Sequence, residues 1–126
     1  MTINRAGRLS ADISTADGTV EFRVTNGLHC YEVLGQPWFA ANNGQGKEFY
    51  VHLPEGIQSG THSLSLYEHG PKIIHVTGNS EAEVFPGMLE LTVGGDAQFS
   101  GSFSGTDADG LQVSGGSFRL EHEASA

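Results

Sequence analysis

The stretch MLELTV-GGDA-QFSGSF-SGTDADGL-QVSGGSFRL, residues 88–120, decides the fold class. It contains three short runs in which apolar and polar residues alternate, and the segments between these runs are rich in Gly and Asp. This pattern is typical of a meander of antiparallel strands that bury one face and expose the other. The C-terminal third of the chain therefore predicts antiparallel β-structure.

The rest of the chain continues this pattern. The whole chain holds 18 Gly and only 4 Pro, and no segment of it shows the periodicity of a helix. Turn signals recur about every ten residues, which is the spacing of a sandwich or barrel of short strands. We predict an all-β fold in one domain over residues 1–126, an antiparallel β-sandwich or flattened barrel of about nine or ten short strands with a C-terminal meander.

Two segments interrupt the alternation. Residues 35–46 (GQPWFAANNGQG) combine aromatic, amide and glycine residues without a period of two, so we expect an irregular loop there. Pro86-Gly87 has the composition of a turn, and we expect it to lead into the meander.

Alternation also predicts the core, because side chains at every second position of a strand share one face. The apolar set chosen in this way comprises Leu9, Ile13, Val20, Phe22, Val24, Phe49, Val51, Leu53, Leu64, Leu66, Ile74, Val76, Leu89, Leu91, Val93, Phe99, Phe103, Val113, Phe118 and Leu120.

The charge of the chain restricts its partners. Fifteen Asp and Glu against six Lys and Arg give a formal net charge of -9. Such a surface repels phosphate backbones and anionic membranes, so we expect no nucleic-acid partner. No stretch approaches the roughly 20 apolar residues that a membrane span requires.

Residues 1–8 lack the apolar run of a signal peptide, which predicts a cytoplasmic location for the chain as it stands, or secretion if a leader has been trimmed. The single cysteine, Cys30, excludes an intrachain disulfide, and we expect it to act as a small buried hydrophobe rather than as a reactive thiol.

The clearest candidate for ligand binding is the segment around the sole tryptophan. Trp38 and Phe39 offer stacking faces, and Asn42 and Asn43 follow with amide donors and acceptors, which together are the chemistry of sugar-binding sites. The alternative is that Trp38 closes one end of the sandwich. The predicted strands also place tyrosines on the faces opposite the most aliphatic ones, as an outward strip suited to a glycan or a partner chain; these are Tyr31, Tyr50 and Tyr67.

These residues favour a non-catalytic binding or interaction module whose ligand is a carbohydrate or a protein, with self-association through a sheet face or an edge strand as an accompaniment. The alternative is a small hydrolytic or metal-dependent enzyme that uses His52, His62 and His75, although the six histidines show no metal-ligand spacing and ordinary half-exposed strand histidines are the preferred explanation. We expect no cofactor, no resident metal and no catalytic residue.

Two acidic patterns have structural explanations. Thr106-Asp-Ala-Asp-Gly resembles the start of a calcium loop, but the later ligands of such a loop are missing, so a hairpin turn is the preferred interpretation. Glu81 and Glu83 share one strand face, as paired catalytic carboxylates could, or they are solvated charges that protect a sheet edge.

Several segments resemble small all-β bacterial domains of unknown function that occur in secreted lipoproteins. The matching segments, all within residues 47–120, are FYVHLP (49–54), GTHSL (60–64), GMLELTV (87–93), FSGSF (99–103) and VSGGSF (113–118). The resemblance implies a β-sandwich and transfers no catalytic or binding residue. Within residues 1–126 the sequence shows neither the lipobox cysteine nor the signal sequence of those proteins.

Overall fold

The computed structural model describes residues 3–33, 36–54, 56–66, 71–78 and 80–122. These residues form eleven β-strands and no helix, and every strand pair is antiparallel. The all-β fold class is confirmed, with a nearly closed sheet that combines features of a sandwich and a flattened barrel. No helix in the described part of the chain could cross a membrane.

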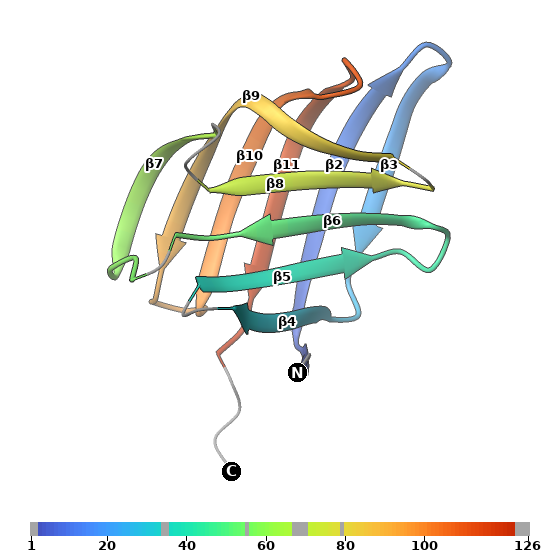
Figure 1. Cartoon of the computed structure of the whole chain (residues 1–126). Helices are drawn as coiled ribbons and strands as arrows, with labels where there is room; N and C mark the ends of the chain where they lie inside the picture. Colours follow the sequence, from blue (N-terminus) through green and yellow to red (C-terminus); the bar gives the residue numbers. More distant parts are fainter. Residues whose placement is uncertain (1–2, 34–35, 55, 67–70, 79, 123–126) are drawn as a thin grey trace.

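The strands lie in two layers that cross at a steep angle (Figure 1). Sheet A contains β1 (Ile3–Arg5), β4 (Leu28–Val33), β5 (Gln36–Asn42), β6 (Lys47–His52), β8 (Lys72–Thr77) and the first residues of β9 (Ser80–Val93), in that spatial order. Sheet B contains β7 (Gly60–Leu66), the remainder of β9, β10 (Phe99–Asp107), β11 (Gln112–Leu120), β2 (Gly7–Thr15) and β3 (Gly18–Val24).

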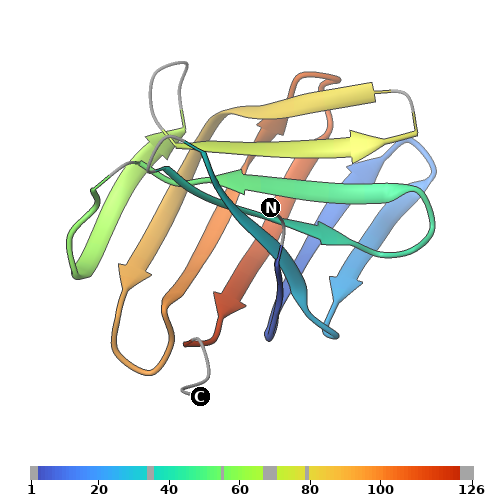
Figure 2. The ribbon, with the colours of Figure 1, turned by 60° about the horizontal axis from the view of Figure 1, so that its bottom comes forward.

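Strand β9 belongs to both sheets. Residues 80–83 pair with β8 in sheet A, whereas residues 87–93 pair with β7 in sheet B. The change of partner lies at Phe85 and Pro86, where the chain bends from one layer into the other (Figure 2). Because proline has no backbone N–H to donate, it suits a position between two ladders. The expected turn at Pro86-Gly87 is therefore wrong, since one continuous strand runs through it.

Consecutive strands of sheet B pair as hairpins. The meander β9–β10–β11 forms as expected, and its order continues through β2 to β3. β2 and β3 are paired without interruption from Leu9 opposite Val24 to Thr15 opposite Gly18.

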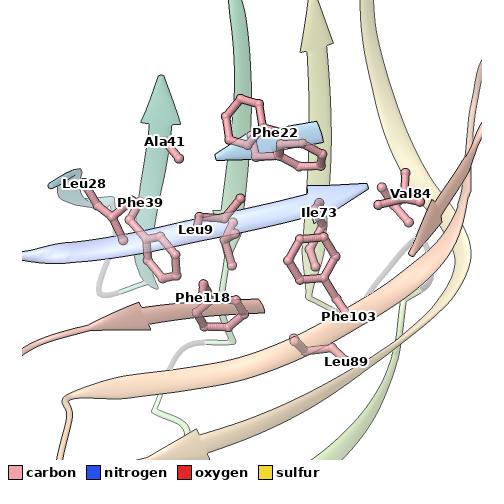
Figure 3. Close-up of a cluster of buried hydrophobic side chains, with 14 of the residues drawn as sticks. Leu9, Phe22, Leu28, Phe39, Ala41, Ile73, Val84, Leu89, Phe103 and Phe118 are labelled. Carbon is pink, nitrogen blue, oxygen red and sulfur yellow. The ribbon is translucent and has the colours of Figure 1, made fainter. Parts of the chain in front are cut away.

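The core fills the space between the two sheets (Figure 3). Phenylalanine rings carry contacts from one layer to the other: Phe22 of sheet B lies 4.9 Å from Phe49 of sheet A, and Phe39 of sheet A lies 5.2 Å from Phe118 of sheet B, between ring centroids. Edge-to-face and tilted packing of this kind adds to the free energy gained from burial alone.

Some predicted core positions are wrong because the faces of β8 are reversed. Ile73 and His75 point inward and are buried, while Ile74 and Val76 lie on the outer face and are partly exposed. Leu64 and Val93 pack against the core but are only partly buried, and Val20 is also only partly buried. Except for these five positions, the predicted core residues are buried.

The segment expected to be an irregular loop is largely regular. Residues 36–42 form β5, which pairs with β4 on one side and β6 on the other. The glycines at 44 and 46 both have positive φ angles and make the short turn between β5 and β6. Apolar residues at alternate positions support the strand despite its Pro and Asn, because Phe39 and Ala41 are buried in the core.

A buried polar pair connects the two sheets. Nδ1 of His75 in β8 lies 3.2 Å from Oδ2 of Asp107 in β10, and the side chains are 4% and 0% exposed. The His75 ring stacks on Phe49 with a centroid distance of 4.8 Å. The second carboxylate oxygen, Oδ1, accepts hydrogen bonds from the backbone N–H groups of Asp109 and Leu111 at 3.0 and 2.9 Å.

Replacing Asp107 should strongly destabilise the fold. Asp107→Ala leaves His75 without its partner inside the core and removes the one oxygen that accepts two hydrogen bonds in the turn, so we expect the free energy of unfolding to fall by about 3 kcal/mol or more. Urea denaturation measures this change.

The matched control is Asp109→Ala in the same turn, where the carboxylate is exposed and accepts a hydrogen bond from the Ser80 hydroxyl. Its effect should stay below about 1 kcal/mol. Equal losses in the two variants would contradict a structural role for the buried pair.

Candidate functional site

The outer face of sheet A carries the most distinctive surface among the described residues. Its positions follow from the pairing of β5, β6 and β8, which places side chains in three rows across the strands. The first row is Trp38, His52 and Lys72; the second is Ala40, Tyr50 and Ile74; the third is Asn42, Glu48 and Val76. Successive rows on one face lie roughly 7 Å apart.

Three aromatic side chains of this face are in contact, and we call them the aromatic platform: Trp38, Tyr50 and His52. The Trp38 ring lies 4.5 Å from the His52 ring and 6.2 Å from the Tyr50 ring, both edge to face. Ala40 also belongs to this outer face, yet it is only 4% exposed. Larger neighbouring side chains therefore cover Ala40, and the platform is a packed layer.

The platform keeps its titratable groups neutral. Burial, and to a lesser degree the positive charge of Lys72, lower the pKa of His52 below its ordinary value. Its Nε2 is buried and has no hydrogen-bond partner among the described residues, which disfavours a charged ring. Burial raises the pKa of Tyr50, and the charge and hydrogen bond of Glu48 act in the same direction. Tyr50 thus remains a neutral phenol at physiological pH.

Of the residues that the sequence nominates for binding, Trp38 and Tyr50 meet on the platform. The backbone of Tyr31 is in register with Trp38, but its side chain and the whole of Tyr67 lie outside the described residues. Phe39 points the other way, into the core, and is 1% exposed. It does not share the face of Trp38, because neighbouring strand residues point to opposite sides.

Asn42 and Asn43 shape the turn after β5. Oδ1 of Asn42 accepts a hydrogen bond from the N–H of Gly44 at 2.7 Å, and Oδ1 of Asn43 accepts one from the N–H of Gln45 at 2.8 Å. Asn42 shares the outer face with Trp38 but lies four residues further along β5, about 13 Å away.

A separate polar cleft of about 470 Å³ lies beside the β5–β6 turn. Its lining comes from Arg23, Val24, Thr25, Asn26, His29, Asn42, Asn43 and Gly44. The cleft lies between the end of β3 and the β5–β6 turn, and His29 of β4 also lines it.

The structure does not bring the predicted histidine cluster together. His52 and His75 lie on opposite faces of sheet A, and His62 lies on β7, which pairs with β9 and not with β6. Within the described ranges, no group of three or more His, Cys, Asp or Glu residues could hold a metal ion.

The remaining reactive candidates have structural roles. Asp107 of the calcium-like segment is buried and closes a turn. Glu83 of β9 forms an ion pair with Lys72 at 3.1 Å. Cys30 is half-buried, and burial raises the pKa of its thiol more than Arg5 lowers it, which disfavours a thiolate.

The contact of His52 with the other platform residues was not predicted from the sequence. The sequence indicated His52 only as a possible metal ligand. Its contact with Trp38 depends on the pairing of β5 with β6, and residues 36–42 were not predicted to form a strand. Once that strand is known, the short turn after it sets Trp38 opposite His52.

Comparison with protein-family models, with curated proteins and with solved structures found no match for this chain. The resemblance to lipoprotein domains therefore stays a prediction.

His52 should make stability depend on pH. An unfolded chain titrates histidine near 6.5, and the folded chain does so at a lower pKa. Between these values the unfolded state binds more protons, so the free energy of unfolding falls as the pH decreases through this window. Thermal melts at about pH 7 and about pH 5 should show a smaller loss of Tm for His52→Phe than for the unchanged protein.

His52→Phe retains an aromatic ring beside Trp38, so it isolates the titration from the packing. The exposed His29 offers the control His29→Phe, which should lose as much Tm on acidification as the unchanged protein. An identical pH response of all three proteins would show that His52 does not contribute.

Proposed function

We propose that this chain is a non-catalytic binding module that holds a carbohydrate on the aromatic platform. The observation that carries the proposal is the contact of Trp38 with Tyr50 and His52 on an outer sheet face. Aromatic rings stack on the apolar faces of sugars, while polar groups around them pair with hydroxyls.

The neighbours of the platform supply such polar groups. Lys72 follows His52 in the first row, Glu48 and Asn42 lie in the third row, and Glu83 sits across from Ile74. Donors and acceptors therefore border the rings at both ends. The distance of about 13 Å from Trp38 to Asn42 exceeds a single sugar ring and suits a short oligosaccharide.

Acidic groups on this face favour a neutral or basic glycan. Glu48, Glu81 and Glu83 share the outer side with the platform, and the whole chain is strongly acidic. Anionic polysaccharides would be repelled by this field, for the same reason that nucleic acid is.

A glycan array followed by titration of the best-bound glycan tests the proposal. Because Trp38 is the sole tryptophan, its fluorescence should change when a sugar stacks on it. Trp38→Ala and Tyr50→Ala should each weaken binding at least about tenfold, which corresponds to about 1.4 kcal/mol.

Met88→Ala is the matched control, since Met88 is a large apolar side chain, 48% exposed, on a strand of sheet B. It should bind as the unchanged protein does. Trp38 is only partly buried, so Trp38→Ala should lower Tm by less than about 5 °C. Unaltered affinity of Trp38→Ala, or the absence of any bound glycan, would contradict the proposal.

A protein partner is the second candidate, favoured by one observation. Ile74 and Val76 extend the platform with partly exposed aliphatic side chains, which suit a protein surface better than a sugar. Ile74→Ser should leave the affinity for a glycan stacked on Trp38 unchanged, whereas it would weaken an apolar protein contact.

A further inference from the structure

The edge of sheet B at β3 is open. In the described part of the chain, β3 pairs with β2 and with no other strand, although it is seven residues long. An exposed edge of this length offers a row of backbone N–H and C=O groups to another strand. Its central residues contain neither proline nor lysine, the usual means of blocking an edge.

Arg23 shows which backbone groups face outward. Its Nη1 donates to the carbonyl of Ala11 at 3.0 Å and to the carbonyl of Phe22 at 2.8 Å. One nitrogen can reach both carbonyls only if both lie between β2 and β3. The backbone N–H and C=O groups of successive residues point to opposite sides of a strand. Those of Thr19, Glu21 and Arg23 therefore point to the free edge.

Space for another strand exists beside this edge. Val20 points toward the core side yet remains partly exposed, in contrast to Phe22 and Val24, which are buried. The polar cleft lies next to Arg23, Val24 and Thr25, and it separates the end of β3 from the β5–β6 turn.

We infer that two copies of this chain associate through β3, which pairs antiparallel with β3 of the second copy about a two-fold axis at Phe22. In this register Glu21 lies opposite Arg23 of the second copy, and Arg23 lies opposite its Glu21. Thr19 lies opposite Thr25 in the same way. The interface is isologous, as symmetric dimers require.

Charge selects this register over its neighbours. A shift by two residues in one direction places Glu21 opposite Glu21, and a shift in the other direction places Arg23 opposite Arg23. Like charges directly opposite one another destabilise a strand pair, and opposite charges stabilise it. In the preferred register, the paired residues are those whose backbone groups face the free edge. Backbone hydrogen bonds and side-chain charges are therefore both satisfied in this register.

The dimer should be weak. Pairing of two seven-residue strands buries less than the roughly 1,200 Å² of a stable interface, so association should depend on protein concentration. Sedimentation equilibrium between about 10 µM and about 1 mM should show the mean mass rising from 13.3 kDa toward twice that value.

Charge reversal gives the decisive experiment. Glu21→Lys makes this edge wholly positive and Arg23→Glu makes it wholly negative, so each variant alone should remain monomeric over this range. An equimolar mixture should restore the dimer, because every cross-strand pair is then opposite in charge. Glu81→Lys, an exposed charge reversal on sheet A, is the control and should dimerise like the unchanged protein.

Arg23→Glu also removes contacts with Asp12 and two carbonyls, so its Tm is checked first. Glu21→Lys tests the inference independently: the Glu21 side chain is 70% exposed, and the change removes its ion pair with Arg23 of the same chain at 3.7 Å. A monomer at all concentrations, dimerisation of Glu21→Lys, or a mixture of stable variants that stays monomeric would each overturn the inference.

Discussion

The fold depends on one strand that serves two sheets. β9 contributes its first residues to sheet A and the rest to sheet B, and this sharing holds the two layers face to face. Four side chains on its inner side are buried: Ala82, Val84, Leu89 and Leu91. Since the strands of one layer cross those of the other steeply, the rings of Phe22, Phe39 and Phe118 fill the space between them (Figure 3).

The buried pair of His75 and Asp107 complements this apolar contact. Polar groups in a core cost free energy unless they are paired, so their partners are fixed more strictly than those of Leu or Val. His75 determines which face of β8 points inward, because it must reach Asp107 in β10. That requirement places Ile74 on the outer face beside Tyr50. A polar contact in the core thus shapes the surface on which the binding proposal rests.

Much of the fold could be predicted, because period-two alternation reports directly on burial. The meander β9–β11 contains clean alternation with Gly or Asp at its turns, and it was predicted. β8 could not be assigned to a face, since its apolar residues Ile73, Ile74 and Val76 occupy both faces and the deciding residue is a histidine. β5 was missed because Pro37 and Asn42 hide a strand that its neighbours on both sides stabilise.

The site was predictable only in part. Trp38 and Tyr50 could be nominated as surface aromatics from composition and alternation, but their contact with His52 depends on which strands are neighbours. Strand order is set by long-range packing, which no local pattern in one sequence encodes. The open edge at β3 could not be predicted for the same reason. β3 has an unpaired edge because it lies at the end of the strand order.

The covered position of Ala40 has a consequence for recognition. The side chains around it are already packed against one another, so the rotamer entropy of the rings is lost when the chain folds. A ligand that binds this face contacts side chains that are already ordered, so binding costs little entropy beyond that of the ligand itself. Preorganisation of this kind raises affinity without adding a contact, and it favours rigid ligands whose shape matches the rings as they stand.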